Sequence, residues 1–502
     1  MTFLVPALST AMLLAALPAQ AAPVRYAEDR APAIVHPLYT TLMSEARLNE
    51  LVFEGLFTDD MELRAKPLLA ESFQLAEDKL SMTLTLRSGA TWHDGKPVTA
   101  DDVVFTIGAM KDPANASTEV GRVAWITEAT AVDPRTVQLT FAGEEYAPED
   151  KLYFKILPAH AFDGGSVQRT GAFRTQPVGS GPFQLGTFNE DNSITLARAD
   201  GASAKLDEVV MREVSDKNYQ AKLLVYESLE ALVRVLPRDL ATLQNDRKIE
   251  LYPYQTNSWW YFGFHHGHAA LKDPKVREAL TLMIDVPSLL APIGTGDILS
   301  GPYVKSSPFY NHEVPPSPHD PDRAAELLTE AGYTFNGKLW LGPGGKELKL
   351  RLTTASNLET AQDVLINVQS QLRSRGVTVE TEFLGDAEWK ARVWRDKDFD
   401  VVLSQWSFDR NEDIYDQFHS DGPRNFVGYG NDKVDELLDT ARITADPQEK
   451  KALMRQVHQL VHDDHPMVFL WTLDSYSALS TKVKSVVVHP FYFFTWAGDW
   501  SM

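Results

Sequence analysis

An aromatic residue and a carboxylate stand three residues apart in the segment LSQWSFDRNEDIYDQF, residues 403–418. This pair is Trp406 and Asp409, and further carboxylates follow at Glu412, Asp413 and Asp416. Such residues can form the floor of a ligand site, or they can belong to an ordinary solvated loop that leads into a helix. The spacing alone favours the loop, so the rest of the chain must decide between the two.

Three histidines lie close together at His265, His266 and His268. Imidazoles at this spacing can bind Ni²⁺ or Zn²⁺. A metal site also needs further ligands and hydrogen-bonded support around them, and these three rings can converge only through a tight bend. We therefore favour polar side chains on a loop, with no bound metal and no cofactor, and keep a metal carrier as an alternative.

A third chemically capable pair is His93 and Asp94, which could act as acid and base in a hydrolase. The sequence contains no G-x-S-x-G, H-E-x-x-H or P-loop motif to supply a nucleophile, a metal or a phosphate site. It also contains no cysteine, which excludes thiolate catalysis, disulfides and iron–sulfur clusters. A tight turn closed by Gly95, next to a core Trp92, explains the pair more simply, and we expect no enzyme.

The amino-acid composition limits the classes of partner that the protein is expected to bind. The 502 residues are enough for two to four domains, and the 44% hydrophobic content supports a packed core. The formal net charge of -21 repels nucleic acid and anionic lipid, and it favours cationic or zwitterionic ligands.

The first residues predict an export signal. Residues 5–18 are apolar, and Ala19-Gln20-Ala21 fits a small-x-small cleavage site, so we expect a signal peptide over residues 1–21. No Lys or Arg precedes Arg25, which leaves the true start codon open, and an uncleaved buried helix is the alternative. No later segment has the roughly 18 apolar residues that a membrane span needs, and lipid attachment at a mature N-terminus would need a cysteine. We expect a soluble, periplasmic protein without an anchor.

The elements that must position these residues alternate between short strands and amphipathic helices. Alternating or continuous apolar patterns predict strands at residues 82–86, 136–141, 347–356, 377–384 and 399–406. Thr99, with Asp102 three residues later, predicts a capped helix start, and Asp320-Pro321 predicts another that ends at Gly332. Helical spacing from Val276 to Ile284, followed by Pro287, predicts a further helix; another is predicted over 359–376, and an aromatic crossover over 253–264. This alternation predicts an α/β fold whose sheet edges carry the ligand loops.

Seven blocks of the sequence, in order, resemble family 5 extracellular solute-binding proteins of ABC importers, the peptide-, nickel- and opine-binding group. The blocks are residues 48–73, 84–113, 177–188, 205–216, 271–290, 320–333 and 429–441. The second block, LTLRSGATWHDGKPVTADDVVFTIGAMKDP, is the most diagnostic. The third resembles the family's Gly-Thr-Gly-Pro-aromatic turn, and here Gly179, Gly181 and Pro182 are expected to be turn residues.

The resemblance implies a large, two-lobed periplasmic-binding-protein-like fold of type II, with an extra subdomain in lobe I. Lobe I would span residues 22–256, with the subdomain inserted at about 66–176, and would regain residues 475–502. Lobe II would span residues 257–474. The ligand would lie between the lobes, which close on it by a hinge.

The resemblance also implies a role for the opening pair. In peptide-binding relatives an Asp three residues after a strand-ending Trp grips the α-ammonium group of the ligand, and Asp409 and Trp406 occupy these positions. Ser404, Gln405 and Ser407 would offer backbone groups to an extended peptide. The aromatic residues that would line the cleft or pack the hinge are Trp259, Trp260 and Tyr261.

The implied function is the substrate-binding component of an ABC transporter, a monomer that binds di- or oligopeptides and delivers them to the permease. Departures from the family pattern, such as His36 where an acid often stands, leave the ligand open. Lys305 and Arg410 are near candidates for a ligand carboxylate. The alternatives are a nickel or metal-chelate carrier, a hydrolase using His93 and Asp94, and a two-lobed module used for regulation without an importer.

Overall fold

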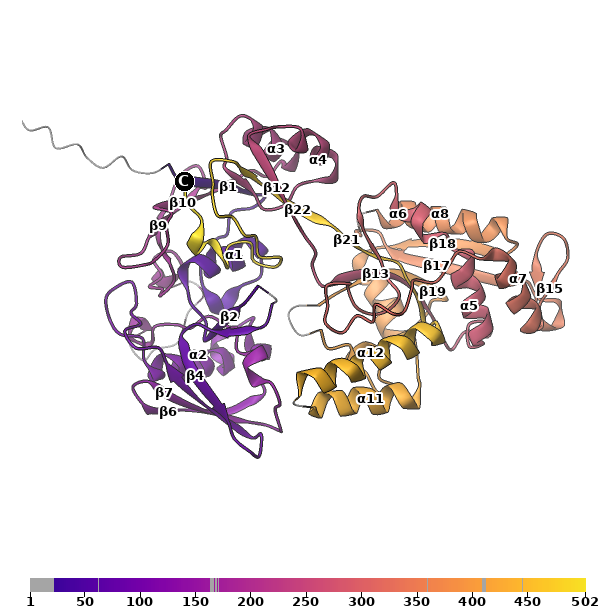
Figure 1. Ribbon diagram of the computed structural model, residues 1–502, viewed down its shortest axis with the longest axis horizontal. Coiled ribbons are helices and arrows are strands. Elements are labelled where there is room, and N and C mark those ends of the chain that lie inside the picture. The colour runs from indigo at the N-terminus through magenta and orange to yellow at the C-terminus, as the bar shows by residue number, and fades with distance from the viewer. Residues whose placement is uncertain are drawn as a thin grey trace, which may run out of the picture.

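The computed structural model describes residues 22–61, 63–162, 167, 169, 171–358, 360–408, 412–444 and 446–502. The predicted signal peptide, residues 1–21, lies outside them. The chain forms two α/β lobes side by side, so the predicted two-lobed fold is confirmed (Figure 1). None of the helices in the described ranges combines the length and the hydropathy that crossing a bilayer requires.

Lobe I is built on a seven-stranded sheet of order β12-β22-β11-β1-β10-β9-β8. Its strands are β1 (Val24–Glu28), β8 (Phe183–Phe188), β9 (Ile194–Arg198), β10 (Glu208–Glu213), β11 (Ala231–Leu232), β12 (Ile249–Tyr254) and β22 (Ser475–Ser480). Its helices are α1 (Met43–Val52), α3 (Lys217–Val225) and α4 (Pro237–Gln244). Strand β1 runs parallel to β10 and β11, so the carboxyl ends of these three strands lie at one edge of the sheet.

A second sheet belongs to the same lobe and forms the extra subdomain. It has the order β4-β5-β7-β6, with β4 (Ala70–Leu75), β5 (Ser81–Leu86), β6 (Ile126–Asp133) and β7 (Thr136–Phe141), and α2 (Ala100–Lys111) packs against β6 and β7. The short pair β2 (Phe57–Asp59) and β3 (Ala65–Pro67) precedes it. Buried apolar side chains of this subdomain and of the main sheet form one continuous core.

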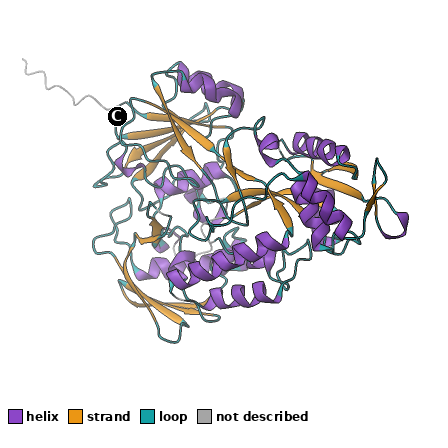
Figure 2. Ribbon diagram, turned by 45° about the vertical axis from the view of Figure 1, so that its right-hand side comes forward, coloured by secondary structure: helices purple, strands orange, loops and turns teal. Residues whose placement is uncertain are grey.

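Lobe II is built on a five-stranded sheet of order β18-β17-β19-β13-β20. Its strands are β13 (Ser258–Phe264), β17 (Lys349–Ala355), β18 (Thr378–Leu384), β19 (Val401–Ser407) and β20 (Met467–Phe469). One face packs against α5 (Pro274–Met283), α7 (Pro321–Glu330) and α8 (Ala361–Ser374). The other packs against α9 (Asp386–Trp389), α10 (Tyr415–Phe418), α11 (Asp432–Ile443) and α12 (Pro447–Asp464). Figure 2 shows these helices beside the sheet.

The chain passes between the lobes twice. Residues 255–257 lead from β12 to β13, and Asp474 joins β21 (Trp471–Leu473) to β22 (Figure 1). Near the second crossing, β21 pairs with β14 (Gly296–Ile298). Each of the four clusters of buried apolar side chains is drawn from one lobe only. The lobes therefore fold around separate cores that two short segments connect.

The predicted local signals are confirmed. The backbone N–H of Thr99 donates to Asp102 Oδ2 at 2.8 Å, as in a capping box, and α2 begins at the next residue. Asp320 accepts a hydrogen bond from the N–H of Arg323 at 3.0 Å, Pro321 opens α7, and Gly332 takes the left-handed φ of 86° after the helix. The five predicted strands correspond to β5, β7, β17, β18 and β19.

The turn at Gly179 and Gly181 packs directly against the end of α1. The N–H of Gly181 donates to the carbonyl of Val52 at 2.9 Å, and the N–H of His93 donates to the carbonyl of Gly179 at 2.8 Å. A Cβ atom on Gly179 would overlap the carbonyl oxygen of Val52. Only glycine allows this turn to connect α1 with the subdomain.

We expect Gly179→Ala to destabilise the protein by about 2 kcal/mol or more, because rigid backbone must move to admit the methyl group. Urea unfolding followed by circular dichroism measures this as a lower midpoint. Gly143→Ala is the matched control, since a Cβ there meets open space. Equal midpoints for the two variants would contradict the argument from close packing.

Candidate functional site

Strands β13 and β19 place the predicted aromatic residues. They pair antiparallel, with Trp259 opposite Trp406, Trp260 opposite Gln405 and Tyr261 opposite Ser404. Successive residues of a strand point to opposite faces, so Trp259, Tyr261 and Trp406 share one face and Trp260 points to the other. The rings of Tyr261 and Trp406 stack with centroids 6.2 Å apart and planes 7° apart.

Burial shows what these aromatic side chains contact. Trp259 and Tyr261 are each 1% exposed and Trp406 is 8% exposed, and all three pack in the core under α10, α11 and α12. Trp260 packs near Trp471, at 6.3 Å between centroids, in the core under α5 and α8. The four rings form the rigid interior of the strand pair, and ligand contact stays a prediction for each of them.

The strand ends lie nearer to solvent. Ser404 and Gln405 are half-buried, and Ser407 is exposed. After β19 the N–H of Phe408 donates to the carbonyl of Asn257 at 2.7 Å, which extends the pairing to the crossing segment. Asp409 and Arg410 lie outside the described residues. The described strand therefore ends at the crossing segment, immediately before Asp409.

Glu412 differs from the sequence interpretation, which placed it on a solvated face. It is half-buried and accepts a hydrogen bond from the hydroxyl of Ser307, and burial raises the pKa of its carboxyl group to about 7. Tyr303 is buried, and its hydroxyl has no partner among the described residues. Burial, together with the nearby charges of Glu412 and Asp413, raises the pKa of this hydroxyl. No local pattern signalled this contact, because Ser307 lies 105 residues away. Asp413 caps the N–H of Tyr415, as a helix-start charge does.

The two crossing segments are tied together by one side-chain amide. Gln255 Nε2 donates to Asp297 Oδ2 and to Asp474 Oδ1, each at 2.9 Å. Lys305 Nζ lies 3.1 Å from Asp297 Oδ1, so this candidate for a ligand carboxylate is engaged with a carboxylate of its own lobe. Burial alone would raise the pKa of Asp297, but the hydrogen bonds from Gln255 and Lys305 lower it below its ordinary value.

The carboxyl edge of the lobe I sheet meets the same crossing segments. After β11 the N–H of Val235 donates to the carbonyl of Tyr476, near the start of β22, so the ends of β11 and β1 point toward the hinge. At the end of β1, Glu28 holds Arg47 of α1 through two short contacts of 2.6 and 2.7 Å. Burial raises the pKa of Glu28, although Arg47 opposes this. No local sequence pattern indicates this buried ion pair, because Arg47 lies 19 residues from Glu28.

In lobe II the parallel strands β17, β18 and β19 also point their carboxyl ends toward the hinge, because the end of β19 pairs with the start of β13. Ligands of α/β proteins bind at the carboxyl ends of strands. The carboxyl edges of both sheets therefore point toward the hinge.

A cavity of about 70 Å³ with both polar and apolar lining opens beside α1 in lobe I. The residues that line it are Pro37, Thr40, Ala46, Asn49, Glu50, Glu119, Arg122, Tyr153, Phe154, Lys155 and Tyr492. Its charges are matched: Lys155 Nζ lies 2.7 Å from Glu50 Oε1, and Arg122 pairs with Glu119. No local sequence pattern indicates this cavity either.

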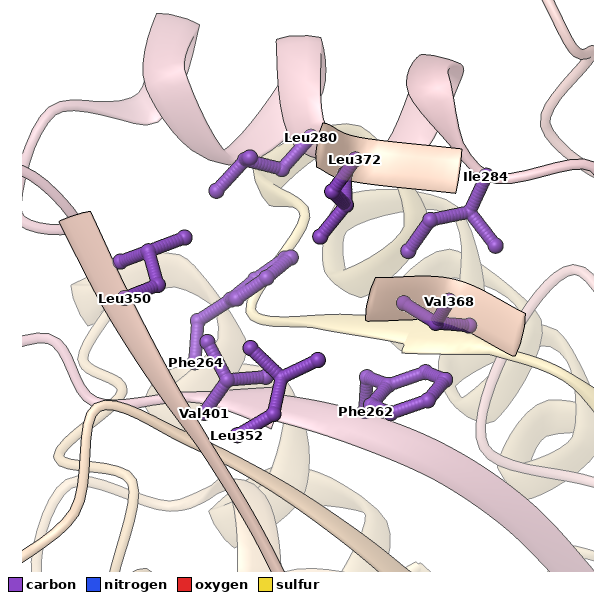
Figure 3. Close-up of a pocket in the computed structure, with 9 residues that line it drawn as sticks. All are labelled: Phe262, Phe264, Leu280, Ile284, Leu350, Leu352, Val368, Leu372 and Val401. Atoms are coloured by element: carbon purple, nitrogen blue, oxygen red, sulfur yellow. The ribbon is translucent and has the colours of Figure 1, made fainter. Parts of the chain in front are cut away.

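A much smaller cavity, about 10 Å³, lies inside lobe II between the sheet and helices α5 and α8. Figure 3 shows the nine side chains around it, all of them apolar. The space is about that of one water molecule and offers no hydrogen-bonding side chain. We interpret it as a packing void.

The histidines considered for metal binding or catalysis have other contacts. His265, His266 and His268 lie in the turn after β13, and His266 is half-buried beside Tyr429, with its pKa lowered to about 3 by partial burial. Across the described ranges, no three His, Cys, Asp or Glu side chains are placed to hold a metal ion.

His93 and Asp94 do not act as a pair. His93 Nε2 lies 2.9 Å from the carbonyl of Gly181, and His93 Nδ1 accepts from the N–H of Gly179 at 3.3 Å. Asp94 instead contacts His160 at 2.7 Å. His93 supports the glycine turn, which leaves neither of its ring nitrogens for proton transfer.

Two separately cored α/β lobes whose carboxyl edges point toward a common hinge define a bilobal binding protein. The model of the bacterial extracellular solute-binding proteins, family 5 (middle region), matches residues 64–426, and the chain belongs to this family. The predicted membership among the solute-binding proteins of ABC importers is thus confirmed.

Relatives and solved structures agree with this assignment. The chain is 26% identical to the oligopeptide-binding protein AppA of Bacillus subtilis (strain 168) over 482 residues, 91% of this chain and 88% of that protein. It is 28% identical to the glutathione-binding protein GsiB of Escherichia coli O1:K1 / APEC over 461 residues, 87% and 86% of the two chains. The structure of HbpA2 from Haemophilus parasuis is similar in fold, with a TM-score of 0.86 and 19% identity over 96% of this chain and 100% of that one.

The burial of the Glu412 carboxyl group can be tested by the pH dependence of the protein's stability. Its folded pKa of about 7 lies above its ordinary 4.5, so the folded state keeps a proton that the unfolded state releases. The wild type should therefore lose stability as pH rises from 4.5 to 7, and Glu412→Gln should not share this loss. We expect the advantage of Glu412→Gln in unfolding midpoint to be larger at pH 8 than at pH 5.

The control is Glu326→Gln, which removes one exposed carboxylate from α7. An equal midpoint difference between Glu412→Gln and wild type at both pH values would show that Glu412 has no raised pKa.

Proposed function

We propose that this protein is the peptide receptor of an ABC importer and performs no chemistry itself. The main support is the direction of the strands: the carboxyl edges of both sheets point toward a hinge made of two short segments. The chain also belongs to the solute-binding family. The relatives AppA and GsiB are named for binding oligopeptides and glutathione, which are both peptides. This common feature supports a peptide ligand for the present chain.

Within this proposal, lobe I comprises residues 22–256 and 475–502, with its subdomain inserted at about 66–176, and lobe II comprises residues 257–474. A ligand closes the lobes only to the extent that it binds the closed state more tightly than the open state. The separate cores favour such a motion, because closure need not break either core. The closed monomer would then dock on the permease subunits, outside the cytoplasm.

Asp409 is the proposed anchor for the ligand ammonium. Strand β19 leads to it, and the hydrogen bond from Phe408 to Asn257 fixes the last described residue before it. An ammonium group that leaves water loses hydration worth several kcal/mol, and a close carboxylate can compensate for this loss. Trp406 supports the strand from its buried face, and Ser404, Gln405 and Ser407 are the proposed backbone partners of an extended peptide.

The ligand class can be tested directly. Native mass spectrometry of the protein purified from its own host identifies what it carries, and calorimetry with alanine peptides of two to five residues, glutathione and Ni²⁺–histidine measures what it binds. Micromolar or tighter binding of at least one peptide supports the proposal. Binding of the nickel chelate with no peptide bound would instead indicate a metal-chelate carrier.

We expect Asp409→Ala to weaken peptide binding by about 3 kcal/mol or more, roughly 150-fold, because the variant strands a buried ammonium without its partner. Isothermal titration against the tightest alanine peptide measures this loss. Asp416→Ala, which removes a nearby acid on α10, should change the affinity less than threefold. A loss below tenfold in Asp409→Ala would mean that the anchor lies elsewhere.

A further inference from the structure

We propose that the side chain of Gln255 is a latch that holds the two crossing segments together and so restricts how far the lobes move relative to each other. Gln255 lies in the first crossing segment, and its hydrogen-bond partners are Asp297 of β14 and Asp474 of the second crossing segment. This inference goes beyond the proposed function, because it concerns the motion of the lobes and holds for any ligand that binds between them.

The carboxylate partners fix the orientation of the Gln255 amide. Asp297 Oδ2 and Asp474 Oδ1 each lie 2.9 Å from Gln255 Nε2. An ionised carboxylate only accepts hydrogen bonds, so the amide must turn its NH₂ group, with both protons, toward these two oxygens. Burial alone would raise the pKa of Asp297, but the hydrogen bonds from Gln255 and Lys305 lower it below its ordinary value, which keeps this partner ionised at neutral pH. Hydrogen bonds to a charged group are stronger than bonds between neutral groups.

The two carboxylates belong to one unit of lobe II and its exit. Strand β14, which contains Asp297, pairs with β21, and β21 ends directly before Asp474. The N–H of Asp474 donates to the carbonyl of Thr295, just before β14, at 3.0 Å. Backbone bonds therefore tie the second crossing segment to β14, and the amide of Gln255 fastens the first crossing segment to the same unit.

The amide also holds together two groups of like charge. Asp297 and Asp474 share one donor, so they lie close to each other and repel. Lys305 Nζ, 3.1 Å from Asp297 Oδ1, offsets part of this charge, but its side chain is 37% exposed and water screens it. Loss of the two N–H groups of Gln255 would therefore remove an attraction and leave a repulsion at the same point.

The other contacts near the crossing segments are weaker. The hydroxyl groups of Thr295 and Tyr476 also lie across the second crossing segment, but they are 3.4 Å apart and exposed to water. A neutral hydrogen bond of this length contributes little. In the part of the chain that the structure describes, each buried apolar cluster lies within one lobe, so apolar packing does not replace the latch.

The latch can be tested by measuring distances between the lobes. The chain contains no cysteine, so Glu77→Cys and Ala452→Cys provide the only two sites for spin labels. Glu77 is exposed in the turn between β4 and β5 of lobe I, and Ala452 is exposed on α12 of lobe II. Double electron–electron resonance without ligand gives the distribution of distances. We expect Gln255→Glu, which adds a third carboxylate, to widen this distribution about twofold or more. Gln255→Met, which has a similar length but no donor, should widen it less.

Gln138→Glu is the matched control, because Gln138 is exposed on β7 and the variant adds the same charge away from the hinge. It should keep the wild-type width. Wild-type tryptophan emission shows that each variant is folded, and Gln255→Met carries the test if the added charge of Gln255→Glu prevents folding. A wild-type width in both Gln255 variants, or equal widening in Gln138→Glu, would show that Gln255 is not a latch.

Peptide affinity separates a latch from a ligand contact. A shift in the balance between lobe positions changes the apparent affinity of every ligand by one common factor. We therefore expect Gln255→Glu to change the affinities of all alanine peptides that bind by the same factor, to within about twofold. Factors that differ by more would place Gln255 in contact with the ligand and overturn the latch. If no peptide binds, the proposed function fails, whereas the distance measurement still decides whether Gln255 is a latch.

Discussion

The side-chain amide of Gln255 joins the two segments on which the two-lobed architecture depends. One segment leads out of lobe I after β12, the other returns through Asp474, and Gln255 also bonds to Asp297 in the strand that pairs with β21. Each cluster of buried apolar side chains in the described residues belongs to one lobe, so no shared apolar core joins the lobes. A hinge of this kind lets two rigid bodies rotate at low cost, because the motion changes few backbone angles.

The carboxyl edges of both sheets end near the same two segments. Strands β1, β10 and β11 end at the hinge in lobe I, and β17, β18 and β19 end there in lobe II. Loops and helix starts follow these strand ends, which is where α/β proteins bind ligands. In lobe I, Glu28 is the last residue of β1 and pairs with Arg47 of α1.

The sequence correctly predicted the features that depend on contacts between residues close together in the chain. The Thr99 cap, the Asp320 cap and the alternating strands depend on neighbours within a few residues, and each formed as predicted. The missed features depend on partners that are remote in sequence: Thr495 meets Glu50 across 445 residues, and Ser307 meets Glu412 across 105. No periodicity encodes such pairs. The family resemblance could predict the architecture and a role for Asp409, but a cavity assembled from four distant segments appears only once the chain is folded.

The aromatic residues of β13 and β19 form a buried core directly before the proposed site. Trp259, Tyr261 and Trp406 are at most 8% exposed, and their stacking holds the strand pair in one register up to Ser407. A loop that follows such a strand starts from a fixed point, so less conformational entropy is lost when it grips a ligand. The near-complete burial of these rings is therefore compatible with the proposal that Asp409, three residues after Trp406, anchors the ligand. The rings thus hold the strand that leads to the proposed anchor, and contact of these rings with a ligand stays a prediction.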